Sequence, residues 1–272
     1  MEATSNPPTS APDSDTVAIE LAKVLKLRRV VLGIDEPGDA PRVISRVPPE
    51  ISPQRQAEID DRRAAEESSN RDGSRLESWK SLLRAAGYRY AHCKLESFET
   101  DRADQQRVVA ALQEYVCEIT DRCDTGTGVV LYGPCGTGKD HLAFSIARAA
   151  VAAYMSVAWL NGQDWYGKIR DSMDDDTPEA TLINRIARPD FAFISDPLPP
   201  IGNLSQHQAT MLYRAIEARY TARRPTIVTV NVATDDEADS RLGVPTWDRI
   251  CDRAWKIRCS WPSYRKPARE IG

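Results

Sequence analysis

The sequence lacks the features that would anchor it in a membrane or stabilise it with disulfides. Its longest apolar runs fall well short of the roughly 18 residues that a membrane-spanning helix needs. The opening Met-Glu-Ala-Thr-Ser does not resemble the basic and then apolar start of a secretory signal. The six cysteines form no Cys-x-x-Cys pair, which disfavours a zinc site and favours reduced thiols. We therefore expect a cytoplasmic protein with no membrane segment.

The excess of negative over positive charge is also small. The net charge of −4 provides no overall attraction to nucleic acid, so any such contact must come from a local patch. The chain has 272 residues, of which 41% are hydrophobic and 28% are charged. These values are ordinary for a soluble globular protein and predict one main domain with an appendage.

The N-terminal region differs in composition from the rest. Eight of the 18 prolines lie in the first 53 residues, mixed with Ser, Asp and Glu. We expect residues 1–15 to be disordered and the next 40 to be loosely structured. Residues 15–35 are an apolar exception that suits either a helix or a helix followed by a strand. Residues 1–85 are thus predicted to form a partly disordered region with a possible partner-binding segment, ahead of an ATPase domain at 86–272.

A helix is predicted at the end of this region, in "SRLESWKSLLRAAG". Ser74 and Glu77 have the spacing of a capping box, and Gly87 is a natural stop. Three apolar residues share one face of this helix: Leu76, Trp79 and Leu83. An amphipathic face of this kind favours packing against a core over binding a partner.

From Gln105 onward, helical and strand patterns alternate. Short apolar segments predict strands in "GVVLYG", "SVAWLN", "FAFIS" and "PTIVTVN". Helical spacing is found in "QQRVVAALQEYVCEI", in residues 139–154, in "LINRIA" and in "QATMLYRAIEARY". Short apolar strands separated by helices predict an α/β fold, with a parallel sheet flanked by helices on both faces.

The loop after the first of these strands carries a phosphate-binding motif. The strand, the loop and the following helix have the order that a P-loop requires, so the chain is predicted to be a P-loop NTPase that binds ATP. Backbone N–H groups of the loop would surround the phosphates, and Lys139 would reach the β- and γ-phosphates. The predicted nucleotide-binding residues here are Gly133, Pro134, Cys135, Gly136, Thr137, Gly138, Lys139 and Asp140.

Two positions depart from the usual metal chemistry of such a site. Asp140 stands where the motif has a Ser or Thr hydroxyl for Mg²⁺. A second buried strand should end in acids that hold Mg²⁺ and polarise water, and "FAFISDP" has Ser195 followed by Asp196. Asp196 suits either the metal-holding or the water-polarising role, or a simple turn before Pro197. We predict Mg²⁺ as a cofactor, with Asp140 and Asp196 as its ligands.

These motifs together resemble the DnaC/IstB-type AAA+ ATPases, the bacterial helicase loaders and their transposition-helper relatives. Four segments carry the likeness, between about Ala86 and Lys266: "AAGYRYAHCKLESFET", "GPCGTGKDHLA", "RYTARRPTIVTVN" and "DRICDRAWKIRCSWPSYRK". The second resembles the family's Gly-x-Gly-Lys-x-His-Leu loop, which adds His141 to the predicted nucleotide site. DnaC-like loaders tolerate a non-hydroxyl residue at the position of Asp140, so this departure is milder than the one at Ser195.

The resemblance implies roles for four further side chains. Asn231 would position the attacking water, which its place at the end of an apolar strand beside the P-loop strand also favours. Arg249 would reach the nucleotide of a neighbouring subunit, and Arg265 would approach the γ-phosphate as a second sensor. Arg249 could instead be a solvated helix charge, with Arg253 as the substitute. Asp196, Asn231, Arg249 and Arg265 are therefore the predicted catalytic residues.

The C-terminal segment has a composition that suits single-stranded DNA. From Arg241 onward there are eight Lys or Arg residues against three acids. Four large aromatic residues are interleaved with them: Trp247, Trp255, Trp261 and Tyr264. Bases can stack on aromatics beside a basic groove. Packing of the Trp residues against the sheet is the favoured interpretation, because Trp is usually well buried.

The sequence predicts an ATP-binding AAA+ protein that couples ATP binding and hydrolysis to the assembly of a replicative helicase on DNA. A transposition helper that acts on a DNA-bound transposase is the alternative within the family. A non-hydrolysing adaptor switched by ATP is the alternative of another class, because the residues at Asp140 and Ser195 threaten turnover more than binding. The role implied for Arg249 also predicts a homo-oligomer.

Overall fold

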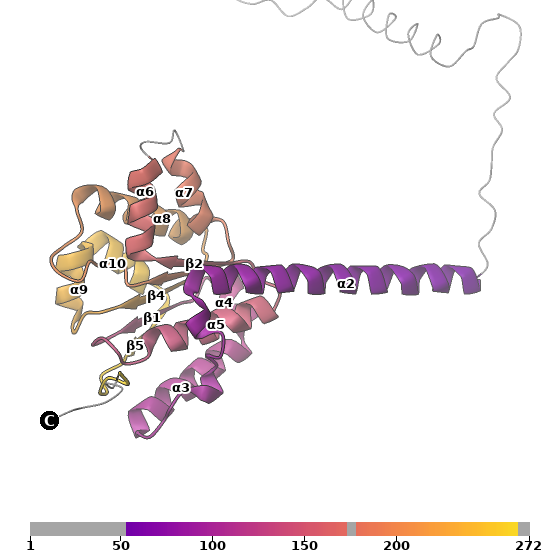
Figure 1. The fold of residues 1–272 in the computed structure, drawn as a ribbon, viewed down its shortest axis with the longest axis horizontal. Coiled ribbons are helices and arrows are strands. Elements are labelled where there is room, and N and C mark those ends of the chain that lie inside the picture. Colours follow the sequence, from indigo (N-terminus) through magenta and orange to yellow (C-terminus); the bar gives the residue numbers. More distant parts are fainter. Residues whose placement is uncertain (1–52, 173–177, 266–272) are drawn as a thin grey trace, which may run out of the picture. The chain divides into compact units, whose positions relative to one another are not determined.

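A computed structural model describes residues 53–172 and 178–265, and in them the predicted parallel sheet is present (Figure 1). Its five strands pair in the order β2-β3-β4-β1-β5, and all four pairings are parallel. The strands are β1 Gly128–Tyr132, β2 Val157–Asn161, β3 Phe191–Ser195, β4 Thr226–Val230 and β5 Ala254–Arg258. The first four match the predicted apolar segments. The fifth was not predicted as a separate strand.

Burial explains which strands the sequence revealed. All five positions of β3 are buried, so its residues are apolar on both faces. The edge strand β5 buries Ile257 and leaves Lys256 and Arg258 exposed. A strand with charged residues at these positions has no continuous apolar run, which removes the signal on which the prediction of a buried strand depends.

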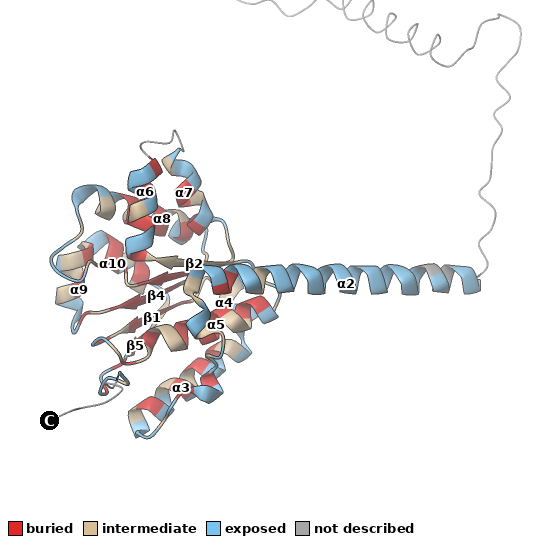
Figure 2. Ribbon diagram, viewed as in Figure 1, coloured by how far each residue is buried: buried red, intermediate tan, exposed pale blue. Residues whose placement is uncertain are grey.

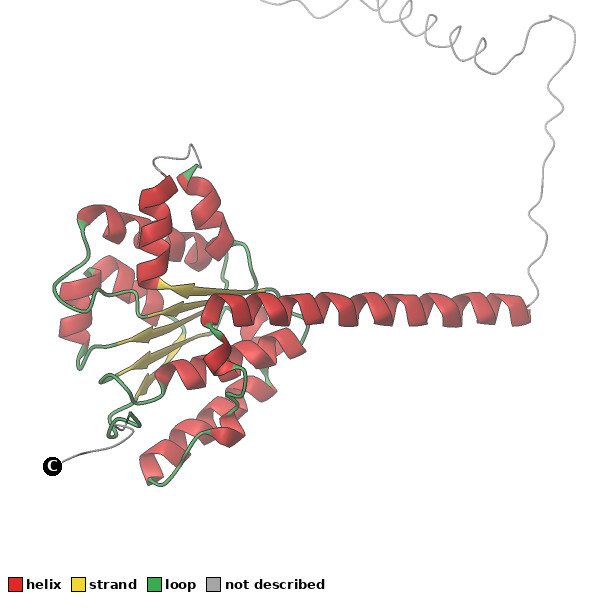
Figure 3. Ribbon diagram, in the orientation of Figure 1, coloured by secondary structure: helices red, strands yellow, loops and turns green. Residues whose placement is uncertain are grey.

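Helices cover both faces of the sheet (Figure 3). The end of α2, with α3 and α5, forms one core with the first face, while α6, α7, α8, α9 and α10 form a second core on the other. Two short 3₁₀ turns, η1 Tyr88–Tyr90 and η2 Leu95–Ser97, join α2 to α3. The α-helices in the described part of the chain are α2 Pro53–Ala86, α3 Ala103–Cys117, α4 Ile119–Thr125, α5 Lys139–Ala152, α6 Gly162–Ser172, α7 Glu179–Ala187, α8 Gln206–Thr221, α9 Asp235–Leu242 and α10 Val244–Cys251.

The helix α2 begins much earlier than predicted. It starts at Pro53 rather than at Ser74, which lies inside it, and it ends before Gly87 as expected. The preceding residues are rich in Ala, Glu, Gln and Arg, which are strong helix formers, and they carry the helix past the capping pattern and through Gly73. The predicted start was therefore wrong.

Among the described residues of α2, those that pack against the core lie at its C-terminal end (Figure 2). Leu82 and Leu83 are buried, and the Trp79 ring meets Phe144 of α5 edge to face, with 5.7 Å between ring centroids. The Arg148 guanidinium lies 4.9 Å from the centre of the Trp79 ring. The predicted packing role is thus confirmed for Trp79 and Leu83, whereas Leu76, also on that face, is 52% exposed.

The sequence interpretations for residues 1–52 lie outside the described residues. Residues 58–272 group as one compact unit. The predicted boundary between residues 85 and 86 stays a prediction. Within the parts that the structure describes, no helix has both the length and the apolar character that crossing a bilayer requires.

Two of the C-terminal tryptophans belong to the protein interior. Trp247 packs in the second core and Trp261 in the first, with exposed fractions of 4% and 2%. The indole N–H of Trp261 donates to the carbonyl oxygen of Thr137, 2.8 Å away. Packing, the favoured interpretation, is confirmed for these two side chains, and neither offers a free face on which a base could stack.

Arg219 joins the two turns that precede β3 and β4. Although it is charged, only 1% of it is exposed. All of its nitrogens donate hydrogen bonds, so the burial of the guanidinium is compensated by polar partners. The acceptors are the carbonyl oxygens of Ile186 (2.7 Å), Pro189 (2.8 Å), Asp190 (2.8 Å) and Pro225 (2.6 Å), and the hydroxyl oxygen of Thr226 (3.0 Å).

Candidate functional site

The phosphate-binding loop runs from Gly133 to Gly138, between β1 and the first turn of α5. Gly133 has φ 138°, and a Cβ there would lie 2.2 Å from the carbonyl oxygen of Cys259. Gly138 caps α5 in the left-handed region, with φ 82°. Only glycine combines these backbone angles with so close an approach, so the loop conformation follows directly from its sequence.

Lys139 lies folded against this loop. Its ammonium group donates to the carbonyl oxygens of Gly133, 2.9 Å away, and Pro134, 2.7 Å away. The residue is 5% exposed, and burial lowers the pKa of its amine, while the charge of Asp196 opposes that shift. A buried cation at the start of a helix, beside a row of loop amides, is suited to bind polyphosphate.

Asp140 accepts hydrogen bonds from three hydroxyl groups. Its Oδ1 accepts from Ser195 at 2.9 Å and from Thr229 at 2.7 Å, and its Oδ2 accepts from Tyr90 at 3.2 Å. Burial, followed by the negative charge of Asp140, raises the pKa of Tyr90 to about 12, which keeps the phenol protonated as a donor. The carboxylate is therefore oriented toward the ends of β3 and β4.

Asp196 and Asn231 form the second polar pair of the site. The amide nitrogen of Asn231 donates to Asp196 Oδ1 at 2.6 Å. Asp196 has φ 46°, which turns the chain immediately after β3. Burial, and then the charge of Asp140, raises the pKa of Asp196 to about 6, against the opposing charges of Lys139 and Arg265. A carboxyl with a raised pKa beside a cation is typical of functional sites.

Most of the predicted side chains line one cleft of about 650 Å³. It lies at the carboxyl ends of the strands, where ligands bind in open α/β sheets. The predicted residues in its wall are Cys135, Gly136, Gly138, Lys139, Asp140, His141, Asp196, Asn231 and Arg265. Gly133, Pro134 and Thr137 complete the loop beneath it. The His141 ring also bonds to the carbonyl oxygen of Lys94, 2.9 Å away, and so fastens the segment before α3 to α5.

Sequence reasoning missed five polar side chains of this cleft, which are Arg89, Tyr90, Asn161, Gln163 and Arg241. Arg89 and Tyr90 come from η1, and the Arg89 guanidinium lies 4.6 Å from the centre of the Tyr90 ring. Arg241 of α9 donates to the carbonyl oxygens of Pro199 and Gly202 and holds the loop after β3. The first two lie in the lead-in segment, where the resemblance offered a signal, but nothing in the local sequence points from Arg241 to the cleft.

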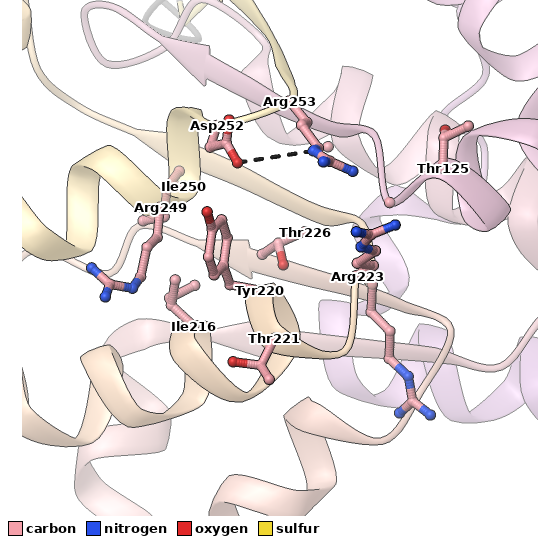
Figure 4. Close-up of a pocket in the computed structure, with 13 residues that line it drawn as sticks. Thr125, Ile216, Tyr220, Thr221, Arg223, Thr226, Arg249, Ile250, Asp252 and Arg253 are labelled. Carbon is pink, nitrogen blue, oxygen red and sulfur yellow. Dashed lines mark ion pairs between the residues drawn. The ribbon is translucent and has the colours of Figure 1, made fainter.

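Arg249 lies apart from the other predicted residues. It lines a cavity of about 370 Å³ that also includes Gly128 and Thr226, the first residues of β1 and β4 (Figure 4). The Arg249 guanidinium pairs with Glu217 and donates to the carbonyl oxygen of Pro245, 3.0 Å away. The structure thus places Arg249 at the amino ends of the strands, away from the nucleotide cleft of its own chain.

A family model for the IstB-like ATP binding protein matches residues 58–271. The chain belongs to this family. The predicted resemblance is thereby confirmed, and this IstB-like protein is an ATP-binding protein of the AAA+ class. The match begins inside α2, so the packed end of that helix is part of the family segment.

Solved structures show the same fold for this IstB-like protein at low identity. The DnaC helicase loader is 20% identical with a TM-score of 0.57, over 63% of this chain and 99% of that one. DnaI is 16% identical with a TM-score of 0.53, over 66% and 94%. AMPPCP-bound DnaA from Aquifex aeolicus is 14% identical with a TM-score of 0.50, over 61% and 50%. No curated protein matches the chain.

The oxygen atoms of the cleft of this IstB-like protein suit Mg²⁺. Mg²⁺ prefers hard oxygen ligands, and it is commonly held by one or two carboxylates together with substrate phosphates. Asp140 and Asp196 supply carboxylates, and Ser195, which directly precedes Asp196, supplies a hydroxyl that donates to Asp140. No cluster of three or more His, Cys, Asp or Glu side chains able to hold a metal occurs among residues 53–172 and 178–265. The donor set therefore fits an ion that is shared with a nucleotide.

Proposed function

We propose that the cleft binds Mg²⁺·ATP and that ATP binding and hydrolysis drive the assembly of a protein partner on DNA. The observation that carries the nucleotide part is the buried Lys139 ammonium against the loop carbonyls, with Asp196 and Asn231 facing the same cleft. Bound Mg²⁺ would be held by Asp140 and Asp196 and would neutralise phosphate charge.

Four side chains of the cleft have roles in phosphate binding or hydrolysis in this proposal. Lys139 binds the β- and γ-phosphates. Asp196 polarises the attacking water, and its 2.6 Å hydrogen bond with Asn231 places the amide where it can orient that water. Arg265 brings a positive charge toward the γ-phosphate from the closing segment. A turnover assay separates this ATPase from a non-hydrolysing adaptor switched by ATP, which would bind ATP and release no phosphate.

Replacement of Lys139 by Ala tests the binding step. We expect ATP affinity to fall at least about tenfold, since charge-assisted contacts contribute on the order of 1.5–3 kcal/mol. Calorimetric titration measures the affinity. Lys168→Ala is the matched control, because it removes a lysine from α6 outside the cleft lining. Unchanged ATP affinity in a folded Lys139→Ala protein would contradict the proposed site.

For the partner, we propose a replicative helicase. The fold likeness to the DnaC helicase loader supports this choice. The family match to IstB-like proteins supports the second candidate, a transposition helper that acts on a DNA-bound transposase. Binding assays with purified replicative helicase and with a transposase–DNA complex from the same organism distinguish the two. Contact with single-stranded DNA, and assembly into an ATP-dependent homo-oligomer, belong to the same proposal.

Removal of residues 1–52 tests the proposed partner-binding region. We expect this deletion to abolish partner binding and to leave ATP affinity within about twofold, because the residues that line the nucleotide cleft lie between Arg89 and Arg265. Deletion as far as residue 85 is unsuitable, since it also removes Trp79, Leu82 and Leu83 from the core. If the protein lacking residues 1–52 still binds its partner, the binding surface lies on residues 53–272 instead.

A further inference from the structure

The two departures from the P-loop pattern are in direct contact. In an ordinary P-loop ATPase, Mg²⁺ is held by a hydroxyl after the P-loop lysine and by an acid at the end of a neighbouring strand. This chain has the carboxylate, Asp140, at the first place and the hydroxyl, Ser195, at the second. The two residues are 55 positions apart in the sequence. In the fold, the Ser195 hydroxyl donates a hydrogen bond to Asp140 Oδ1 at 2.9 Å.

We propose that Asp140 and Ser195 have exchanged the two Mg²⁺-holding roles of the site. The carboxylate ligand comes from the first turn of α5, and the hydroxyl comes from the end of β3. The donor set keeps one carboxylate and one hydroxyl, with their attachment points reversed. This inference rests on the proposed ATP site and specifies how that site holds its metal.

The hydrogen bonds of Asp140 leave it able to act as a ligand through one oxygen. An ionised carboxylate offers about four lone-pair positions. Ser195 and Thr229 occupy two on Oδ1, and Tyr90 occupies one on Oδ2. One position on Oδ2 remains for a cation. The three hydroxyls also fix the rotamer of Asp140, which is the support that a ligand needs from its surroundings.

The charge balance of the cleft makes the two residues dependent on each other. Asp140 and Asp196 already place two carboxylates in the wall of one cleft. An acid at position 195 would be a third, at a position that is 5% exposed beside the buried hydroxyl of Thr229. Like charges at such short range are costly away from water. A carboxylate after the lysine is therefore compatible only with a neutral donor at the end of β3.

The exchange also assigns a role to Asp196. The Ser195 side chain bonds to Asp140, whereas Asp196, whose φ of 46° turns the chain after β3, bonds to Asn231. That position suits the polarisation of water, so the exchange narrows the proposed metal ligands from Asp140 and Asp196 to the Asp140 carboxylate with the Ser195 hydroxyl.

A reciprocal double substitution tests the exchange. The variants are Asp140→Thr, Ser195→Asp and the double variant, which recreates the ordinary arrangement. Two quantities are measured for each: the thermal midpoint of the nucleotide-free protein, and ATP affinity by calorimetry with Mg²⁺ and with chelator. Ser145→Ala is the matched control, because it removes a buried α5 hydroxyl that donates to the carbonyl oxygen of His141, 2.8 Å away, and lies outside the cleft lining.

The expected result is rescue. Wild-type ATP affinity should fall about tenfold or more when Mg²⁺ is removed. This ratio of the affinities with Mg²⁺ and with chelator, the Mg²⁺ factor, corresponds to about one charge-assisted contact. Asp140→Thr should reduce that factor to about threefold or less. Ser195→Asp should lower the midpoint of the free protein and weaken ATP binding in chelator. The double variant should recover both the Mg²⁺ factor and the midpoint, so that the effects of the two changes are not additive.

Independent effects of the two substitutions, with no recovery in the double variant, would overturn the exchange. If the double variant does not fold, the nearly isosteric Asp140→Asn decides: an unchanged Mg²⁺ factor overturns the inference, and a reduced one supports it. The proposed function fails separately, since it predicts that the wild type binds ATP and that Lys139→Ala binds it at least about tenfold more weakly. A wild type that binds through Lys139 without rescue at positions 140 and 195 contradicts the exchange alone.

Discussion

An Arg249→Ala variant is expected to lose up to about 10³-fold in ATP turnover while binding ATP as well as the wild type. Arginines that act on transferring phosphoryl groups contribute factors of this size. Arg249 lies near the amino ends of β1 and β4, whereas the cleft with Lys139 lies at their carboxyl ends. It can therefore serve only a nucleotide that is bound by another subunit.

Mixed oligomers measure this directly. An Arg249→Ala subunit keeps an intact cleft, and a Lys139→Ala subunit keeps an intact Arg249. The mixture should recover part of the turnover that each protein lacks alone. No recovery, with both proteins present in the same oligomer, would count against a shared site.

Arg253 provides the matched comparison. Its side chain is 54% exposed and lies 4.0 Å from Asp252, while Arg249 is held by Glu217 and lies over the rings of Tyr213 and Tyr220. Figure 4 shows the Arg249 guanidinium directed away from Arg253. We expect Arg253→Ala to retain most of its turnover. A large loss in Arg253→Ala with none in Arg249→Ala would assign the role to Arg253.

Replacement of Arg219 by Met is expected to destabilise the folded protein by about 3 kcal/mol or more, because each buried acceptor that is left without a partner costs about 1–3 kcal/mol. Met has a similar length and cannot donate a hydrogen bond. The carbonyl oxygens of Ile186, Pro189, Asp190 and Pro225 would then be buried without this donor. Chemical denaturation monitored by circular dichroism measures the loss.

Arg214→Met is the control for this change. Arg214 is on the same helix, α8, and pairs with Glu179 at 2.7 Å, but its side chain is 46% exposed. Exposed ion pairs contribute about 0–1 kcal/mol. Equal destabilisation by the two substitutions would show that the buried hydrogen bonds of Arg219 are not the cause.

The sequence was most informative where function fixes local geometry. The P-loop needs glycines with positive φ and a lysine at the helix start, and these requirements lie within eight consecutive residues. The buried strands β1 to β4 were recognisable because burial on both faces demands continuous apolar residues. Asn231 could be placed beside the loop because β4 pairs with β1.

Contacts between distant segments could not be predicted in the same way. Asp140 and Ser195 were interpreted as two separate departures from the motif, because their hydrogen bond depends on the order of strands in the sheet. The start of α2 was misplaced because a capping pattern at Ser74 is a local signal, and the strong helix formers before it outweigh that signal. Glu217, the partner of Arg249, lies on a different helix and 32 positions away in the sequence, so no local pattern points to it.

The attachment of the phosphate loop to the closing segment has a consequence during protein synthesis. The loop bonds to residues made much later: Tyr264 donates its backbone N–H to the Gly136 carbonyl at 2.9 Å, and Trp261 donates to Thr137 across 124 positions of sequence. A nascent chain on the ribosome exposes the loop and α5 while these partners are still untranslated. The phosphate loop therefore gains its contacts with the closing segment only after Tyr264 has left the ribosome, so the nucleotide site is completed late in folding.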